Sequence, residues 1–241
     1  TDTEQEIWGD REAYSLNGDI EFSHVAFGYD TSSSLVMRDC SFSISHGESV
    51  SIYGNNGIGK STIFKLILGM YNNYKGNILI DKRELHEYSI FSLRKRIGIV
   101  SQNTFLFKGS LLDNIRISSP SIPEYRIKEV LKISGCEIIF GDNVANIQVE
   151  EYGKNLSGGQ KQAAAIARCL LRDPDILLFD EATIHLDEVS SKIVLDAFIN
   201  VFKDKTRIII THDYTIAGLV DRILFLNDGM IQEAQLSELS Q

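Results

Sequence analysis

The chain has 241 residues, of which 43% are hydrophobic and 24% charged, and its formal net charge is −9. This composition is typical of a globular protein and excludes wholesale disorder or a fibrous repeat. The acidic charge disfavours binding to nucleic acid, because neutralising phosphates requires clustered cations, and we expect no nucleic-acid partner. No apolar stretch approaches the roughly 20 residues of a membrane-spanning helix. The acidic first ten residues lack the apolar core of a signal peptide, so we expect the isolated chain to be soluble.

The three cysteines are Cys40, Cys136 and Cys169. They lie far apart, they are odd in number, and they form no Cys-x-x-Cys pair, which disfavours a zinc site or a disulfide framework. We expect buried free thiols in a reducing compartment.

In the first half of the chain, residues 1–18 are polar, lack periodicity and contain one large apolar residue, Trp8, which predicts a linker. Apolar and alternating patterns then predict a series of strands. These strands cover residues 19–24, 40–44, 49–53, 77–81 and 97–101. A helical pattern follows the third strand, and the basic run Arg94-Lys95-Arg96 is interpreted as the solvated face of another helix.

From residue 103 the texture changes to short helical patterns, at 110–115 and 124–133, separated by prolines. A longer alanine-rich helix opens at Ser157. Residues 175–179 and 207–210 are continuously apolar, as in parallel strands covered on both faces. Residues 222–232 predict a hairpin that turns at Asn227-Asp228-Gly229. Strands and helices alternate, so the predicted class is α/β with a helical insertion.

A glycine-rich segment between a strand and a helix, Gly54-Asn55-Asn56-Gly57-Ile58-Gly59-Lys60-Ser61-Thr62, matches the phosphate-binding loop pattern. Its glycines allow the backbone to curl closely around phosphate oxygens. The helix that follows aims its positive N-terminus at the anion. Lys60 is expected to reach the β- and γ-phosphates, and the Ser61 hydroxyl to bind Mg²⁺.

Two carboxylates, Asp180 and Glu181, end the apolar strand at 175–179. Open α/β sheets bind ligands at the carboxyl ends of their strands. Asp180 is therefore expected to hold Mg²⁺ through water, and Glu181 to polarise the attacking water as general base.

The string Leu156-Ser157-Gly158-Gly159-Gln160 predicts a helix N-cap followed by two glycines, which is a second anion site. One phosphate loop with two anion-binding helix starts is explained by a head-to-tail dimer. In such a dimer the cap of one chain closes over the nucleotide of the other.

With these motifs in order, the chain resembles the nucleotide-binding domain of ABC transporters over about residues 19–240. Gly54–Thr62 match the Walker A loop, Asp180 and Glu181 the end of Walker B, and Leu156–Gln160 the signature. The remaining matches are Tyr29 to the adenine-stacking aromatic, Gln102 to the Q-loop, Asp187 to the D-loop and His212 to the switch histidine.

The resemblance implies a P-loop NTPase (RecA-like) core with an antiparallel β subdomain and an inserted α-helical subdomain. It implies a linker at 1–18 that follows a transmembrane domain, and an ATPase domain at 19–241. Within that domain, 19–102 and 168–241 form the catalytic core and 103–167 the helical subdomain with the signature.

The resemblance also implies ATP and Mg²⁺ as ligands. Catalytic roles fall on Glu181, His212 and Gln102, and metal contacts on Ser61, Gln102 and Asp180. Nucleotide contacts fall on Tyr29, Gly54, Asn55, Asn56, Gly57, Ile58, Gly59, Lys60, Ser61, Thr62, Ser157, Gly158, Gly159 and Gln160. The implied partners are a transmembrane domain and a second nucleotide-binding domain, which is either an identical or a different chain, at the cytoplasmic face of the cell membrane.

Two segments resemble exporters within the family: 107–115 after the Q-loop, and 149–153 with Glu151 before the signature. An exporter motor is therefore the first hypothesis, and the cargo, which contacts the membrane domain, stays open. A non-transport ABC ATPase acting as a nucleotide-dependent clamp is the alternative, but its usual coiled-coil insertion or second cassette is absent from this sequence. A module that binds ATP without turnover is disfavoured by the presence of Glu181 and His212.

The chain departs from the family pattern at four positions, which are Ala163, Ile184, His185 and Ala234. Ala163 replaces an arginine after the signature, and Ile184 and His185 replace a serine and an alanine of the D-loop. His185 is either a bystander or a residue of the dimer interface. These departures leave the hydrolytic residues intact and place the contacts across the dimer in question.

Overall fold

The structure, a computed structural model, describes residues 8–30, 34–117 and 121–238, with only the backbone described at 142, 143 and 145. The chain forms two compact units. The first comprises 1–97, 175–178 and 204–241, and the second comprises 98–174 and 179–203. The linker expected at 1–18 and the subdomains expected at 19–102, 103–167 and 168–241 are not tested by this division and stay predictions.

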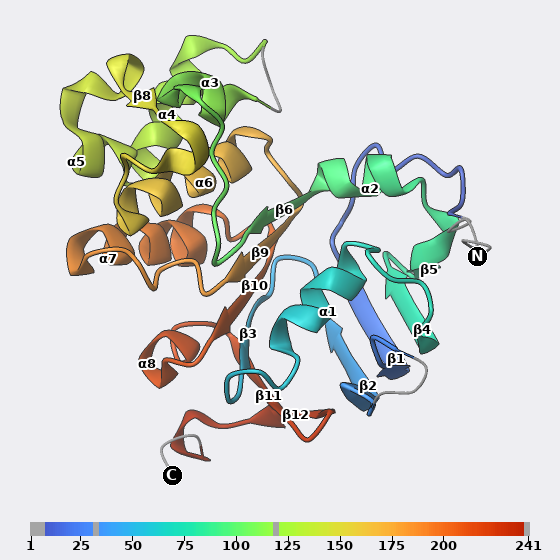
Figure 1. Cartoon of the computed structure of the whole chain (residues 1–241). Coiled ribbons are helices and arrows are strands. Elements are labelled where there is room, and N and C mark those ends of the chain that lie inside the picture. Colours follow the sequence, from blue (N-terminus) through green and yellow to red (C-terminus); the bar gives the residue numbers. More distant parts are fainter. Residues whose placement is uncertain (1–7, 31–33, 118–120, 239–241) are drawn as a thin grey trace. The chain divides into compact units, whose positions relative to one another are not determined.

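An antiparallel group of strands forms one part of the first unit (Figure 1). β1 (Ile20–Phe27) pairs with β2 (Met37–Ile44) on one side and with β4 (Lys75–Ile80) on the other, and β4 also pairs with β5 (Arg83–Glu84). Buried Phe22, Val25 and Phe27 alternate with more exposed residues along β1, as expected for a strand with one face against the core.

A parallel group forms the other part of the first unit. β3 (Ser49–Tyr53) lies between β10 (Thr206–Thr211) and β11 (Arg222–Asn227), parallel to both. β12 (Met230–Ala234) returns antiparallel to β11, which confirms the predicted hairpin, and it also pairs with β2. The strand order is β5-β4-β1-β2-β12-β11-β3-β10.

Short helices connect the strands of the first unit. α1 (Lys60–Ile67) follows β3, α2 (Ile90–Arg96) leads into β6 (Ile97–Val100), and α8 (Tyr214–Ala217) follows β10. Single 3₁₀ turns lie at Leu85–Glu87 and Leu236–Glu238. Ile63, Phe64, Leu66 and Ile67 of α1 are all buried, so this helix turns one face fully into the core.

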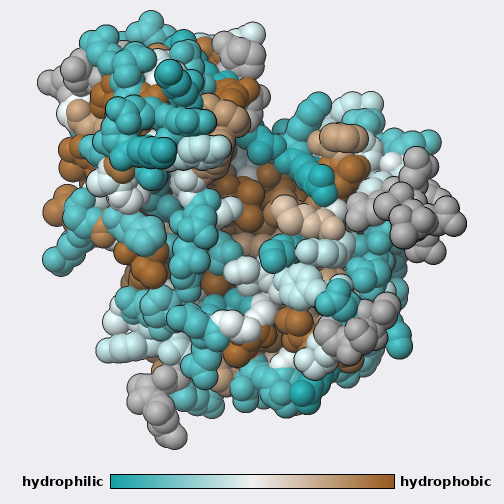
Figure 2. All heavy atoms as spheres, viewed as in Figure 1, coloured by the Kyte–Doolittle hydropathy of each residue, from teal (hydrophilic) through white to brown (hydrophobic). Residues whose placement is uncertain are grey.

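The second unit is mainly helical. α3 (Leu111–Arg116), α4 (Glu124–Ile133) and α5 (Cys136–Phe140) all contact α6 (Gly158–Leu171). The buried alanines Ala163, Ala164 and Ala167 allow neighbouring helices to approach α6 closely. α7 (Glu188–Asp196) continues into a π-helical turn at Ala197–Val201. Figure 2 shows teal, hydrophilic side chains over most of the visible surface of this unit.

Short elements complete the second unit. β7 (Gly109–Ser110) pairs with β8 (Gln148–Val149), and 3₁₀ turns lie at Gly141–Asn146 and Glu151–Gly153. β6 and β9 (Ile176–Asp180) are the strands along which the chain passes from one unit to the other. The predicted α/β class with an inserted helical region is therefore confirmed.

The expectation that Arg94-Lys95-Arg96 forms a solvated face was wrong for both arginines. Arg94 donates to the carbonyl oxygens of Leu68 and Gly69 at 2.9 Å each, just beyond the end of α1. Arg96 makes two hydrogen bonds of 2.6 Å to the carboxylate of Asp175. Long basic side chains suit helix C-termini and carboxylates, and these partners lie too far away in the sequence to be predicted from it.

All three cysteines are buried free thiols, as expected. Burial raises the pKa of Cys40, Cys136 and Cys169 to about 12 each. At pH 8 a thiol with such a pKa is ionised in only about one molecule in ten thousand, and the thiolate is the reactive form.

We therefore expect the folded chain to react very slowly with Ellman's reagent at pH 8. Three thiols should react at once after unfolding in guanidinium chloride, and free cysteine serves as the rate standard. A thiol of the folded chain that reacts at the rate of free cysteine would contradict the assigned burial.

Candidate functional site

The phosphate-binding loop of the first unit runs from the end of β3 to the start of α1. Gly59 is the N-cap of α1 and has a φ of 106°, a backbone angle that residues other than glycine rarely adopt. A Cβ there would lie 2.5 Å from Cγ1 of Val36. Glycine is thus required at this position by both backbone conformation and space.

Lys60 is the one charged residue of the loop, and only 6% of its surface is exposed. Its Nζ donates to the carbonyl oxygen of Gly54 at 2.7 Å and to that of Asn55 at 2.9 Å. The N-cap of α1 offers no side-chain hydrogen bond, and its first turn contains no acidic residue. A cation beside an N-terminus without a competing side chain fits a phosphate group.

Tyr29, the expected adenine contact, lies against the same helix. Its hydroxyl is 2.8 Å from Oγ1 of Thr62 and accepts a hydrogen bond from Lys65 Nζ at 3.1 Å. The Lys65 ammonium lies 5.0 Å from the centre of the Tyr29 ring, and the rings of Phe27 and Tyr71 meet it edge-on. Tyr29 as a whole remains 39% exposed. The contact of Lys65 could not be predicted from the sequence, because its partner lies 36 residues away.

His212 follows β10 at the same edge of the sheet as the loop. Thr211, the last residue of β10, pairs with Tyr53, the last residue of β3. His212 and Gly54 are the residues that follow this pair. His212 is exposed. The next residue, Asp213, caps α8. A hydrogen bond from the Thr215 side chain lowers its pKa, and the charge of His212 acts in the same direction.

The second unit brings Gln102 and Glu181 together. Gln102 Nε2 donates to Oε2 of Glu181 at 2.8 Å, across 79 residues of sequence. Glu181 follows Asp180, the last residue of β9, and has a φ of 51°. A left-handed conformation is strained for a residue other than glycine, and such strain concentrates at functional sites.

The predicted signature begins α6. Ser157 is the N-cap, and its Oγ accepts from the backbone N–H of Gln160 at 3.2 Å. The Gln160 side chain accepts in return from the backbone N–H of Ser157 at 2.9 Å, which completes a capping box. Ser157 and Gly158 are exposed at this helix start.

The two glycines of the signature pack against the segment that follows Glu181. A Cβ at Gly159 would lie 2.8 Å from the carbonyl oxygen of His185, and a Cβ at Gly158 would lie 3.2 Å from Cβ of His185. Backbone hydrogen bonds from Ile184 to Glu181 and from Leu186 to Thr183 form turns in this segment. The helix start and the segment after Glu181 are therefore in close contact within one chain.

Asp187, the D-loop match, caps α7. It accepts hydrogen bonds from the backbone N–H of Ser190 at 3.0 Å and from its hydroxyl at 2.9 Å. These bonds hold the pKa of Asp187 below its ordinary value.

The predicted site residues thus form two sets. The first unit holds Tyr29, Gly54–Thr62 and His212, and the second holds Gln102, Ser157–Gln160, Asp180 and Glu181. Sequence reasoning missed the roles of Gln162 and Arg168, polar residues whose side chains leave α6 towards residues 101–107. Their presence in an alanine-rich helix was the available signal.

The family model for "ABC transporter" matches residues 37–184, which is more than half of the chain. The chain belongs to the ABC transporter family.

Among solved structures, a bacterial Atm1-family ABC exporter with ATP bound is similar over 99% of the chain and 43% of its own, with a TM-score of 0.91 and 32% identity. The toxin RTX-I translocation ATP-binding protein of Actinobacillus pleuropneumoniae is 37% identical over 90% of this chain and 31% of its own length. The ATP-dependent lipid A-core flippase of Photorhabdus laumondii is 37% identical over 93% of this chain and 39% of its own length. The chain therefore spans less than half of the length of these ABC proteins.

Within the three described ranges of this ABC domain, no helix is both long enough and apolar enough to span a membrane.

The contact between Gly159 and His185 predicts an unusual result for Gly159→Ala. Alanine normally stabilises a helix over glycine by up to about 1 kcal/mol. Here the new Cβ would meet a backbone oxygen at 2.8 Å, so we expect a net loss of about 1–3 kcal/mol in the nucleotide-free chain. Thermal unfolding measures it, with Gly158→Ala as a control in which the closest contact is longer. A raised Tm in Gly159→Ala would contradict the contact.

Proposed function

We propose that the chain is the ATP-binding and ATP-hydrolysing motor domain of an ABC exporter, working as a nucleotide-bridged dimer. The observation that carries the proposal is the hydrogen bond of 2.8 Å between Gln102 and Glu181. It orients a carboxylate at the carboxyl end of β9, where α/β proteins bind their ligands. An oriented carboxylate is what a general base for water requires.

The first task of the site is to hold the triphosphate. Lys60 already has its ammonium directed at oxygen atoms, the carbonyls of Gly54 and Asn55, and phosphate oxygens are stronger acceptors. The α1 N-terminus adds backbone N–H donors without a competing acidic side chain. Tyr29 would offer its exposed ring to the base.

A magnesium ion bound with the nucleotide would neutralise charge on the phosphate oxygens. Ser61, Asp180 and Gln102 would hold it, since all three carry the oxygen ligands that Mg²⁺ prefers. The hydrogen bond to Glu181 uses the amide nitrogen of Gln102, which leaves the amide oxygen as the metal-binding atom.

Glu181 then orients the attacking water and accepts its proton. The N–H of Gln102 fixes the rotation of the carboxylate, so the oxygen that does not accept this bond points to a defined place. His212 would contact the γ-phosphate from the strand end beside the loop. Positioned groups of this kind account for most of the catalysis in phosphoryl transfer.

The dimer follows from the second helix start. Ser157, Gly158 and Gly159 are placed at the N-terminus of a helix of 14 residues, which favours an anion. In the proposed dimer this anion is the triphosphate bound by a second domain, identical or different. The partner domain in the membrane and the position at the cytoplasmic face of the cell membrane are part of the same proposal. They are supported by the family and by relatives named for translocation and export.

Glu181→Gln should lower the rate of ATP turnover by a factor of about 10² to 10⁴, because it removes the general base. The variant should still bind ATP. Light scattering of this variant with Mg-ATP should show a mass twice that without nucleotide. Glu188→Gln, which alters an exposed carboxylate of α7, is the matched control and should behave as wild type. Turnover by Glu181→Gln at the wild-type rate would refute the assigned base. A variant that binds ATP as a monomer would refute the homodimer.

Ser157 offers a way to separate capping from nucleotide binding. Ser157→Asp keeps an N-cap acceptor of similar strength, so the Tm should stay near that of wild type. Its negative charge should prevent ATP-dependent dimerisation in the Glu181→Gln background. Ser157→Ala loses the cap, at a cost of about 1 kcal/mol, or a Tm lower by roughly 2–4 °C. An ATP-dependent dimer of Ser157→Asp would show that this helix start does not bind the triphosphate.

A further inference from the structure

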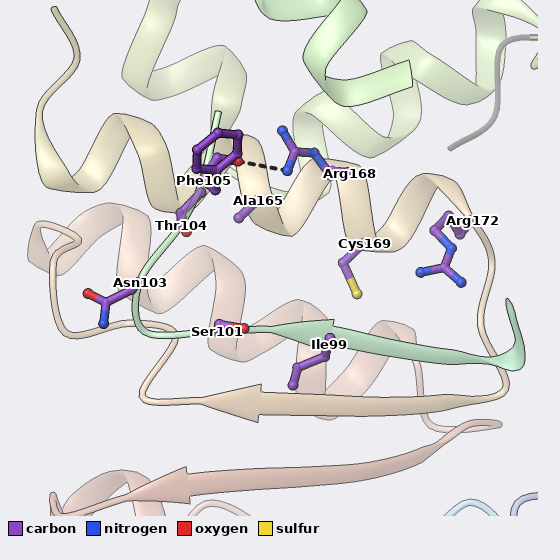
Figure 3. Close-up of a pocket in the computed structure, with 9 residues that line it drawn as sticks. All are labelled: Ile99, Ser101, Asn103, Thr104, Phe105, Ala165, Arg168, Cys169 and Arg172. Atoms are coloured by element: carbon purple, nitrogen blue, oxygen red, sulfur yellow. Dashed lines mark hydrogen bonds between the residues drawn. The ribbon is translucent and has the colours of Figure 1, made fainter. Parts of the chain in front are cut away.

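Two polar side chains of α6 face the irregular segment that follows β6. Gln162 has only 1% of its surface exposed, and Arg168 lies two turns further along the helix. Arg168 lines a cavity of about 240 Å³ together with Thr104 and Phe105. Figure 3 shows its hydrogen bond to Phe105. Neither residue belongs to the motifs that carry the proposed function.

Gln162 bonds to both sides of Gln102. Its Oε1 accepts from the hydroxyl of Thr104 at 3.2 Å, and its Nε2 donates to the carbonyl oxygen of Ser101 at 3.4 Å. Gln102 lies between these two anchor points, and its own amide donates to Glu181. Each bond is long, and the two hold Gln102 from both sides, through the backbone of Ser101 and the side-chain hydroxyl of Thr104.

Arg168 holds the next part of the segment. Its Nη1 donates to the carbonyl oxygen of Phe105 at 2.9 Å and its Nε to that of Asn114 at 2.9 Å. The Asn114 side chain in turn accepts from the N–H of Phe107 and donates to its carbonyl oxygen, both at 2.8 Å. The guanidinium and this amide therefore fix three backbone groups of residues 105–107.

Residues 101–107 form neither helix nor strand. The side chains of α6 and Asn114 thus supply hydrogen bonds that regular structure would otherwise provide. A displacement of α6 would move this segment together with the helix, because both arginine and glutamine bond to its backbone.

We propose that Gln162 and Arg168 are positioning residues that tie Gln102, and through it the Glu181 carboxylate, to the helix that begins at Ser157. The proposal rests on the proposed function for its catalytic consequence, since it concerns the base of that reaction. It means that a nucleotide bound at Ser157 affects the position of the Glu181 carboxylate of the same chain. The link uses hydrogen bonds between α6 and residues that lie 58 to 63 positions away in the sequence.

Gln162→Met is the main test, because methionine keeps the length of the side chain and removes its hydrogen bonds. Ser101 is exposed and Thr104 is half-buried, so water can replace the lost partner and the variant should fold. In the nucleotide-free chain, hydrogen exchange of the peptide covering 101–107 should become faster. In Mg-ATP, kcat should fall about tenfold or more with KM changed less than about twofold, because a misplacement of about 1 Å in a catalytic group costs on the order of 10²-fold.

Gln148→Met is the matched control, since it makes the same change at an exposed side chain of the same unit. Arg168→Lys keeps the charge and loses the planar fork, and it should reproduce both effects of Gln162→Met. Thr104→Val removes the hydroxyl bonded to Gln162, so its effect on kcat should not add to that of Gln162→Met.

The two readouts separate this inference from the proposed function. Unchanged exchange at 101–107, or a wild-type kcat in Gln162→Met, would overturn the positioning role while ATP turnover stands. An additive effect of Thr104→Val would overturn it as well. If wild type and Glu181→Gln hydrolysed ATP at the same rate, the proposed function would be refuted instead. The hydrogen-exchange result would still decide whether α6 holds residues 101–107.

Discussion

The buried ammonium group of Lys60 sets the local design of the first unit, because a charge removed from water needs oxygen partners. The loop supplies them by turning the carbonyls of Gly54 and Asn55 towards it. The chain can curl that tightly only with a glycine at position 59, where φ is 106° and Val36 leaves no room for a Cβ. Lys60, the glycines and the order strand–turn–helix therefore depend on one another. The parallel pairing of β3 with β10 then delivers His212 to the same sheet edge.

The second unit solves a different problem, which is to hold a carboxylate in place on a strained backbone. Glu181 has a left-handed φ of 51°, a cost of about 1–3 kcal/mol that the surroundings must offset. Two segments constrain the position of Glu181, and both contact α6. One carries Gln102 and is held by Gln162 and Arg168. The other, residues 184–186, packs on the signature glycines. The helix that presents Ser157 is thereby also the frame of the proposed base.

The sequence could predict those features whose determinants are local. Glycine spacing located the loop, continuous apolar runs located β9 and β10, and the helix predicted at 124–133 coincides with α4. Features that depend on distant partners could not be predicted. Arg96 was assigned to solvent because its acceptor, Asp175, is 79 residues away, and Lys65 showed no link to Tyr29. The Gln102–Glu181 bond lies between these cases, since the sequence selected both residues but not their contact.

The departure at His185 has a physical explanation in how this segment packs on the signature glycines, and nothing in the structure explains Ile184. The closest approach to Gly159 is made by the carbonyl oxygen of His185, a backbone atom that any residue supplies. The atom nearest to the position of a Cβ on Gly158 is Cβ of His185, which alanine also carries. The ring of His185 adds only Cγ at 3.4 Å and Nδ1 at 3.8 Å from that position. Intrachain packing therefore depends on the glycines and tolerates a change from alanine to histidine. The imidazole of His185 is exposed beside the start of α6.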